Sequence, residues 1–310
     1  MRPTAFIPNY DGAVQLRRTL ASLREQSRPL DIVVVDNGSG DDSAALVRED
    51  FPEVALLELG ENLGFGPAIN RAVREHGGDP VVLLNNDVEC EPRFVEALLD
   101  PYGEGIDSVA GVLLQERATG LIDSAGVIAD QTLMGFDYLN GEPVKALDHA
   151  TDPLGPTGGA ALYRRAAFDA VGGFDERIFL YYEDLDLALR LAARGGRCRL
   201  APGARALHAY SASLGARSGR KFARTGWSRG YMLRRYGVTA RPRLASRALA
   251  AEAAICAGQI LLDRTTAGIG GRLRGWRAGA GLERRQLGEA ELLRLSLRQA
   301  LALRRRRHGG

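Results

Sequence analysis

The first hundred residues alternate between short apolar runs and amphipathic segments, and this alternation limits the fold more than any other feature. The apolar runs are predicted strands at 4–7, 31–35, 54–57 and 81–84. Predicted helices lie between them, over 16–23, after Asp41 and Asp42, over 67–76 and from Pro92. Strands alternating with helices predict an α/β fold with a mostly parallel central sheet flanked by helices.

Polar residues follow each of the four predicted strands. Ligands of open α/β sheets bind beyond the carboxyl ends of the strands, so these residues are expected along one rim. Asn, Asp and Gly also favour turns, and turn chemistry explains any single loop equally well. Four such loops in series favour a binding site. The loops are 9–11, 36–39, 61–64 and 85–87.

Two acidic positions have the residue types that catalysis needs. Asp87 follows the fourth strand, and Mg²⁺ typically takes one or two protein carboxylates together with substrate phosphates. The alternative is an Asx turn that closes the strand. Further on, 183–186 carries three carboxylates at a predicted helix start, where the helix dipole favours them. Capping needs fewer acids, so a general base that removes a proton from a hydroxyl is an equal alternative.

The charge is unevenly distributed along the chain. Residues 215–310 hold 22 Lys or Arg and 5 Asp or Glu, a net charge of +17, whereas residues 1–214 have a net charge of −14. A basic segment of this kind suggests an anionic partner, either a membrane surface or nucleic acid, with a solvated helical surface as the alternative. An apolar stretch at 248–262, interrupted by Glu252 and Gln259, favours a helix lying in a membrane interface over one that spans it. Three widely spaced cysteines favour a reducing compartment.

The order of the motifs resembles glycosyltransferase family 2, which has the GT-A fold, and is most similar to its bacterial rhamnosyltransferase-like branch. The resemblance covers roughly residues 4–214. It is carried by segments 33–39, 62–66 with Asn70, 84–87, 172–176 and 179–186, followed by His208.

The resemblance implies roles for individual residues. Asp184 matches the catalytic base, with Glu183 beside it, and Asp87 and His208 match the metal ligands. The nucleotide-sugar site would be formed by Pro8, Asn9, Asp36, Gly38, Asn62, Gly64, Asn86, Gly158 and Gly159. Two positions depart from the family pattern. Asn85 replaces the first carboxylate of the metal motif, and Pro8-Asn9-Tyr10 differs from the usual order at the first strand.

The expected function is therefore an inverting, Mg²⁺- or Mn²⁺-dependent sugar transfer from a dTDP- or UDP-sugar. The expected acceptor is a glycan or a polyprenyl-diphosphate-linked glycan of the cell envelope, and no nucleic-acid partner is expected. We expect a catalytic domain over 1–214, with a nucleotide-binding half to about 100 and an acceptor half over 101–214. We expect a basic helical extension over 215–310 and a cytoplasmic protein, either free or peripheral on the inner face of the cell membrane. The alternatives are a metal-dependent nucleotidyltransferase and a non-enzymatic protein that binds membranes or nucleic acid through its basic tail.

Overall fold

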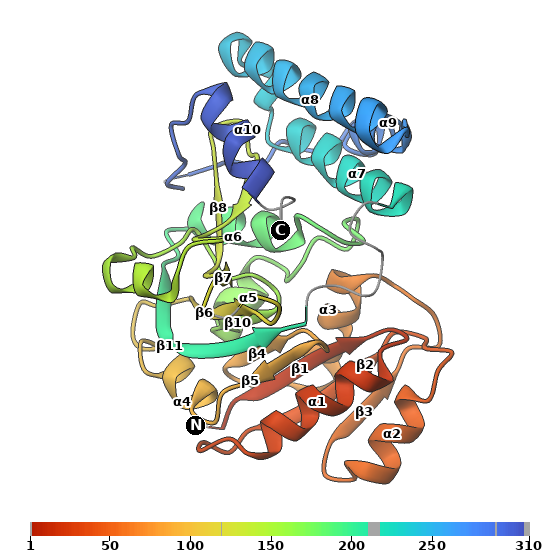
Figure 1. Cartoon of the computed structure of the whole chain (residues 1–310), viewed down its shortest axis with the longest axis vertical. Coiled ribbons are helices and arrows are strands. Elements are labelled where there is room, and N and C mark those ends of the chain that lie inside the picture. Colours follow the sequence, from red (N-terminus) through yellow and green to blue (C-terminus); the bar gives the residue numbers. More distant parts are fainter. Residues whose placement is uncertain (1, 119, 210–217, 289, 307–310) are drawn as a thin grey trace.

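The centre of the molecule is a mixed sheet, here taken from a computed structural model that describes residues 2–118, 120–209, 218–288 and 290–306. Within those residues nine strands join in the order β3-β2-β1-β4-β10-β6-β11-β5, with β7 paired to β6 (Figure 1). A separate hairpin contains β8 and β9. The strands are β1 (Thr4–Asn9), β2 (Asp31–Asp36), β3 (Ala55–Glu58), β4 (Val81–Leu84), β5 (Val88–Cys90), β6 (Ser108–Gln115), β7 (Ile122–Ser124), β8 (Val127–Ala129), β9 (Gly135–Asp137), β10 (Ala160–Tyr163) and β11 (Cys198–His208).

The first four strands are parallel, as the alternating pattern predicts. β1 lies between β2 and β4, and its last residue, Asn9, is in register with Asp36 at the end of β2. The polar loops after these strands therefore meet at one edge of the sheet. β1 continues beyond the predicted strand at 4–7, through Pro8 to Asn9. At Pro8 the strand pairs only with β2, because β4 pairs with β1 no further than Phe6, so the missing N–H is tolerated there.

Helices cover both faces of the sheet. Successive residues of β1 face opposite cores, with Ile7 packed beside α1, α2 and α4 and Phe6 beside α3, α5 and α6. The predicted helices are confirmed with shifted starts, since α3 begins before Pro67 and α4 after Pro92. The helices on the two faces are α1 (Ala13–Arg24), α2 (Ser43–Asp50), α3 (Phe65–His76), α4 (Phe94–Leu99), α5 (Arg165–Ala170) and α6 (Glu183–Ala192), and of these α5 was not predicted.

The second half of the sheet adds antiparallel pairings. β10 runs antiparallel to both β4 and β6, and β11 runs parallel to β6 and antiparallel to β5. The short strands β7, β8 and β9 and the 3₁₀ helix η1 (Val144–His149) lie between β6 and β10 in the chain. Because β11 passes between β6 and β5, its last residue, His208, is in register with Val88, one residue beyond Asp87. The sheet thus brings two distant predicted metal ligands together.

The C-terminal helices pack at the end of the molecule opposite to α1 and α2, as Figure 1 shows. α7 and α9 approach so closely that a Cβ on Gly275 would lie 1.8 Å from the carbonyl oxygen of Trp227. Buried residues of α7 share an apolar cluster with Leu185 and Leu189 of α6. These elements are α7 (Gly219–Arg235), η2 (Val238–Ala240), α8 (Pro242–Asp263), α9 (Ala267–Ala278) and α10 (Leu297–Arg306). The expected domain boundary at 214/215 and the side chains of Arg304 to Arg307 lie outside the described residues.

Candidate active site

Hydrogen bonds join the polar loops after β1, β2 and β4. Asn86 Nδ2 donates to Asn9 Oδ1 at 2.6 Å, and Asn9 Nδ2 donates to Ser39 Oγ at 3.2 Å. Asp36 is 4% exposed, and its Oδ2 accepts from the backbone N–H of Ser39 at 3.1 Å. Its other oxygen, Oδ1, is buried and has no hydrogen-bond partner among the described residues. Asp36 therefore offers an acceptor to a ligand at this rim.

The loop after β3 is fixed against the loop after β2. Asn37 Nδ2 donates to the Gly64 carbonyl at 3.1 Å, and Asn37 Oδ1 accepts from the Leu63 N–H at 2.8 Å. Asn62 Oδ1 accepts from the Gly64 N–H at 3.0 Å. The sequence motifs contain Asn37, but its role as the link between the two loops was not predicted. These bonds hold the two walls of one site at a fixed separation.

Two glycines are required by backbone approach. Gly38 has φ +81°, and a Cβ there would lie 2.7 Å from Glu61 Cα. Gly64 has φ +91°, and a Cβ there would lie 2.5 Å from the carbonyl oxygen of Phe179. Any side chain at either position would be strained and would push the loops apart. Gly64 therefore allows the loop after β3 to pack against the segment that leads into α6.

The predicted pair Gly158 and Gly159 lies just before β10, beside the same loops. A Cβ on Gly158 would lie 2.7 Å from the ring of Phe65, and one on Gly159 would lie 3.1 Å from Asn85 Nδ2. Pro8 is half-buried in β1, next to Asn9. Each predicted nucleotide-sugar residue thus lies in, or in contact with, the loops at this rim.

Asp87 and His208 lie together, and Asp123 joins them. The Nε2 of His208 is 3.3 Å from Asp87 Oδ1, and its Nδ1 is 2.7 Å from Asp123 Oδ2. All three side chains are 13% exposed. Asp123 also approaches Asn140, which donates to the Asp123 backbone carbonyl at 2.6 Å. Asp123 is on β7, across β6 from His208. Sequence reasoning missed Asp123 because no local motif marks it.

These side chains fit a divalent cation. The 3.3 Å approach lacks hydrogen-bond geometry, so Asp87 Oδ1 is a buried carboxylate oxygen without a hydrogen-bond partner in the described part of the chain. Within that part, no three His, Cys, Asp or Glu side chains converge as ligands. Two protein ligands suffice for Mg²⁺ when water and substrate phosphates supply the rest. A carboxylate that holds the other nitrogen of a ligating histidine is a common support for such ligands.

The charge on His208 follows from its neighbours. Burial alone would lower its pKa, but the hydrogen bond to Asp123 and the proximity of Asp87 outweigh burial and raise the pKa to about 10. An imidazolium between two carboxylates is thus the stable form in the absence of a cation. A bound cation competes with that proton, because only the neutral imidazole is a metal ligand.

The start of α6 is a strained turn that carries two acids. Tyr181 and Tyr182 have φ of 69° and 71°, a left-handed conformation that non-glycine residues seldom adopt. Glu183 and Asp184 follow directly, and Glu183 is buried while Asp184 is half-buried. Asp184 Oδ1 accepts from the Leu185 N–H at 2.7 Å. Such strain at the position of two adjacent acids marks this turn as a functional candidate.

The two acids differ in their ionisation. Burial and the neighbouring charge of Asp184 raise the pKa of Glu183 to about 8. Its Oε2 has no hydrogen-bond partner among the described residues. With a pKa near 8, Glu183 is largely protonated at neutral pH.

This shift predicts a pH-dependent stability. Because the folded-state pKa of Glu183 lies above its unfolded value, its contribution to stability falls as the pH rises from about 4.5 through about 8. We expect wild type to lose roughly 2 to 3 kcal/mol more than Glu183→Gln between pH 6 and pH 9. Urea unfolding at both pH values measures this, with exposed Glu49→Gln as the control. Equal pH dependence of wild type and Glu183→Gln would contradict a raised pKa.

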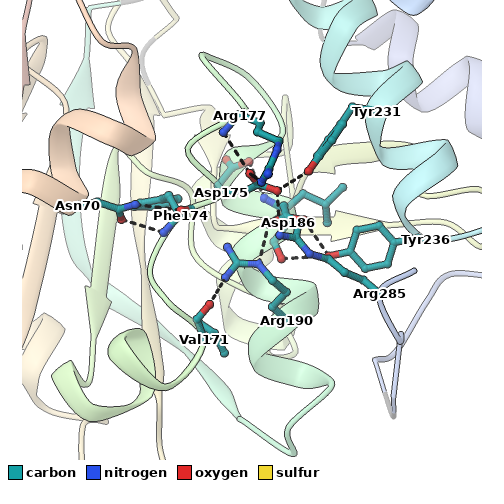
Figure 2. A network of polar contacts seen from close by, with 12 residues as sticks. Asn70, Val171, Phe174, Asp175, Arg177, Asp186, Arg190, Tyr231, Tyr236 and Arg285 are labelled. Carbon is teal, nitrogen blue, oxygen red and sulfur yellow. Dashed lines mark hydrogen bonds and ion pairs between the residues drawn. The ribbon is translucent and has the colours of Figure 1, made fainter. Parts of the chain in front are cut away.

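A buried ionic network surrounds Asp186, the third acid at the start of α6 (Figure 2). Asp186 is 0% exposed and receives Arg190 Nε at 2.7 Å and the Tyr236 hydroxyl at 2.9 Å. Its Oδ1 also accepts from Arg285 Nη1, and Arg285 Nη2 reaches Asp175 Oδ2 at 2.8 Å. The third acid of the predicted cluster is therefore structural. Sequence reasoning missed Arg285, which comes from a segment assigned only a surface role.

The unsatisfied carboxylates coincide with the predicted site. Over the described residues, three buried carboxylate oxygens lack a hydrogen-bond partner, and they belong to Asp36, Asp87 and Glu183. A buried acceptor without a partner is costly and is uncommon in native proteins. All three were predicted as site residues from the sequence.

The family models that match this chain and its relatives of known function both describe glycosyltransferases. The chain matches the model of glycosyl transferase family 2 over residues 4–172 and that of glycosyl transferase family group 2 over residues 145–265. It is 33% identical over 231 residues to N-acetylglucosaminyl-diphospho-decaprenol L-rhamnosyltransferase of Mycobacterium tuberculosis H37Rv, which covers 66% of this chain and 75% of that protein. It is 32% identical over 206 residues to the succinoglycan biosynthesis protein ExoA of Rhizobium meliloti, covering 62% of this chain and 58% of that protein.

Solved structures share the architecture at low sequence identity. The mannosyltransferase PcManGT from Pyrobaculum calidifontis, in complex with GDP-Man and Mn²⁺, has a TM-score of 0.54 at 19% identity, over 91% of this chain and 88% of that one. GalNAc-T7 with UDP, GalNAc and Mn²⁺ has a TM-score of 0.60 at 14% identity, over 92% and 55%. These likenesses bear on the fold alone.

Proposed function

This chain belongs to glycosyl transferase family 2, in its rhamnosyltransferase-like branch with the GT-A fold, and from that premise we propose that it catalyses an inverting sugar transfer in cell-envelope polysaccharide synthesis. The donor is a nucleotide diphosphate sugar, and the acceptor is a hydroxyl of a polyprenyl-diphosphate-linked glycan. The observation that carries the proposal is the set of three buried carboxylate oxygens without hydrogen-bond partners among the described residues. Asp36 would accept a hydrogen bond from the nucleotide base and Asp87 would bind the metal ion. Glu183 lies beside the proposed general base.

In this account Asp36 recognises the nucleotide base. Its Oδ1 accepts a hydrogen bond from the imide N–H of thymine or uracil, which would satisfy the buried acceptor. The loops around Gly38, Asn62 and Gly64 form the walls, and their close packing leaves no room for a side chain at either glycine. The similarity to an L-rhamnosyltransferase supports dTDP-rhamnose as the proposed donor of this chain.

Donor selection is testable by binding. We would measure thermal stabilisation with dTDP-rhamnose, UDP-glucose, UDP-N-acetylglucosamine and GDP-mannose, each with Mn²⁺, because a ligand that binds only the native state raises its stability. Stabilisation by a dTDP- or UDP-sugar that is lost in Asp36→Ala is the expected result. Stabilisation by GDP-mannose alone would contradict imide recognition, and stabilisation by no nucleotide sugar would contradict the function.

Asp87 and His208 would hold Mg²⁺ or Mn²⁺ at the edge of β4 and β11. When bound, the cation stabilises negative charge on the donor diphosphate. Asp123 keeps the Nδ1 of His208 engaged, so that Nε2 is directed at Asp87. Asn85 contributes no carboxylate, and the protein therefore supplies one acid and one imidazole.

Asp184 acts as the general base. It takes the proton of the acceptor hydroxyl while that oxygen forms a bond to the anomeric carbon. The bond from the anomeric carbon to the phosphate oxygen breaks, and the diphosphate leaves with the electron pair. Glu183, whose pKa is raised to about 8, is largely protonated at neutral pH and is therefore a poorer base for this step than its neighbour Asp184. The contact between Gly64 and Phe179 brings the donor loops against the segment that leads to Asp184.

A lipid-linked acceptor requires access to a membrane. Among the described helices, only α8 is long and apolar enough to cross a membrane by length and composition, and 28% of its apolar window is buried. Leu261 and Leu262 at its end are 77% and 74% exposed, and Asp263 and Arg264 follow them. An exposed apolar helix end in a segment of net positive charge suits the interface of an anionic membrane. The protein would then be cytoplasmic and peripheral at the inner face of the cell membrane.

This membrane contact predicts a specific loss of binding. Replacing Leu261 and Leu262 together by Gln removes apolar area from the contact, and we expect about tenfold or more weaker binding to phosphatidylglycerol vesicles. Vesicle sedimentation measures it. Val14→Gln is the matched control, because Val14 is 75% exposed on α1 at the other end of the molecule. If the double variant bound vesicles as strongly as wild type, the end of α8 would not be part of the membrane contact.

A further inference from the structure

We propose that Arg285, in the C-terminal extension, is a positioning residue of the active site that fixes the start of α6 and thereby the carboxylate of Asp184. The inference rests on the proposed role of Asp184 in the transfer. It assigns a part of the active-site support to a segment that lies about a hundred residues beyond the base.

The guanidinium of Arg285 bridges two buried carboxylates. Its Nη2 lies 2.8 Å from Asp175 Oδ2, and its Nη1 contacts Asp186 Oδ1. The side chain of Arg285 is 17% exposed, whereas those of Asp175 and Asp186 are 2% and 0% exposed. Figure 2 shows Asp175, Asp186 and Arg285 in one network of polar contacts. A planar, two-pronged donor is suited to joining two carboxylates, and a lysine cannot reproduce it.

The bridge is itself anchored by the extension. The backbone N–H of Arg285 donates to the Arg235 carbonyl at 2.7 Å, at the end of α7. From the same helix Tyr231 donates to Asp175 Oδ2 at 2.6 Å, and Tyr236, just beyond it, donates to Asp186 Oδ1 at 2.9 Å. Both aspartates can therefore accept these hydrogen bonds only when α6 and the C-terminal extension keep their observed relative position. The extension thus helps to hold α6 in place.

The turn before α6 needs such support. Tyr181 and Tyr182 adopt left-handed φ angles, which relax unless surrounding contacts hold them. The Asp186 N–H donates to the Tyr182 carbonyl at 2.9 Å, so Asp186 is tied directly to the strained turn. On the other side of the turn, the Ser228 hydroxyl of α7 donates to the Leu180 carbonyl at 3.2 Å. The extension thus holds both sides of the turn, and Asp184 lies between these two contacts.

The uneven charge of the chain gains a second explanation. Arg285 pairs with two acids of the acidic body, and Arg247 of α8 pairs with buried Asp130 at 2.8 Å. Part of the positive charge of the tail therefore compensates buried negative charge of the catalytic unit.

The test compares Arg285→Ala with Arg284→Ala, because Arg284 is the exposed neighbour of the same residue type. We expect Arg285→Ala to lower kcat by about 10- to 100-fold, since small misplacement of a catalytic group has effects of this size. The KM for the donor should change by less than about threefold, because the donor loops have no contact with Arg285 in the described network. Guanidinium added at millimolar concentration should restore part of kcat, which a general loss of stability would not allow. Arg284→Ala should behave as wild type.

Hydrogen–deuterium exchange separates this inference from the role of Asp184. Faster exchange over residues 181–187 in Arg285→Ala, with unchanged exchange in the sheet, is the expected result. Wild-type kcat in Arg285→Ala, or unchanged exchange over these residues, would overturn the inference. If Arg285→Ala does not fold, the same comparison is made with Arg285→Lys, which retains the charge but cannot bridge both acids. An active Asp184→Asn would refute the base while leaving the exchange test valid.

Discussion

Asp184→Asn is expected to lower the rate of sugar transfer by about 10²- to 10⁴-fold, the range typical of losing a general base. Asn keeps the side-chain oxygen that accepts from the Leu185 N–H, so the start of α6 should keep its structure. Donor binding should change little, because Asp36, Asn62 and Gly64 remain in place. The loss should therefore appear in kcat, with the KM for the donor within about threefold of wild type.

The controls for this variant separate chemistry from folding. Glu49→Gln removes an exposed carboxylate of α2 and should retain full activity. Thermal unfolding of Asp184→Asn should follow that of wild type within a few degrees. Transfer at more than about one tenth of the wild-type rate would rule out Asp184 as the base, since the expected loss is at least about 10²-fold.

Asp87→Ala is expected to remove Mn²⁺ binding and to lower transfer by about 10²-fold or more. Asp87 Oδ1 is a buried carboxylate oxygen 3.3 Å from His208 Nε2, and Asp87 is the one acid of this motif because Asn85 occupies the other acidic position. A single histidine is a weak site for a hard cation, so affinity should fall below detection by calorimetry. The measurement is titration of Mn²⁺ into wild type and variant in the presence of a nucleoside diphosphate.

The matched control is Asp42→Ala, because Asp42 is exposed at the N-terminus of α2. It should leave Mn²⁺ affinity and transfer unchanged. Retention of Mn²⁺ binding by Asp87→Ala would place the cation elsewhere, and retention of both binding and transfer would dismiss the metal role of Asp87.

Local sequence patterns were enough to predict the first half of the fold. The apolar strands at 31–35 and 81–84 and the polar loops that follow them occur where the alternating pattern indicates. The three unsatisfied carboxylates, Asp36, Asp87 and Glu183, lie at strand ends and a helix start that local patterns indicate, and the family resemblance singled out these residues within them. The boundaries shifted by a few residues at Pro8 and Pro92, where proline is compatible with more than one local arrangement.

Long-range partners could not be predicted in the same way. Asp123 reaches His208 across β6, over 85 positions of sequence, and only the strand order brings them together. Arg285 reaches Asp186 over 99 positions and Asp175 over 110. Nothing in an Arg-rich segment distinguishes the one arginine that is buried against two acids from its exposed neighbours. Such residues become visible only when tertiary packing decides which charges lose contact with water.

Formation of the glycosylated lipid tests the central claim most directly. The protein would be incubated with dTDP-rhamnose, Mn²⁺ and a polyprenyl-diphosphate-linked N-acetylglucosamine acceptor, and the lipid product would be analysed by mass spectrometry. UDP-sugars would be run in parallel. We predict a product one sugar heavier from a dTDP- or UDP-sugar, formed by wild type and lost in Asp184→Asn. Absence of a glycosylated product with every donor, or equal product from the Asp184→Asn variant, would contradict the account.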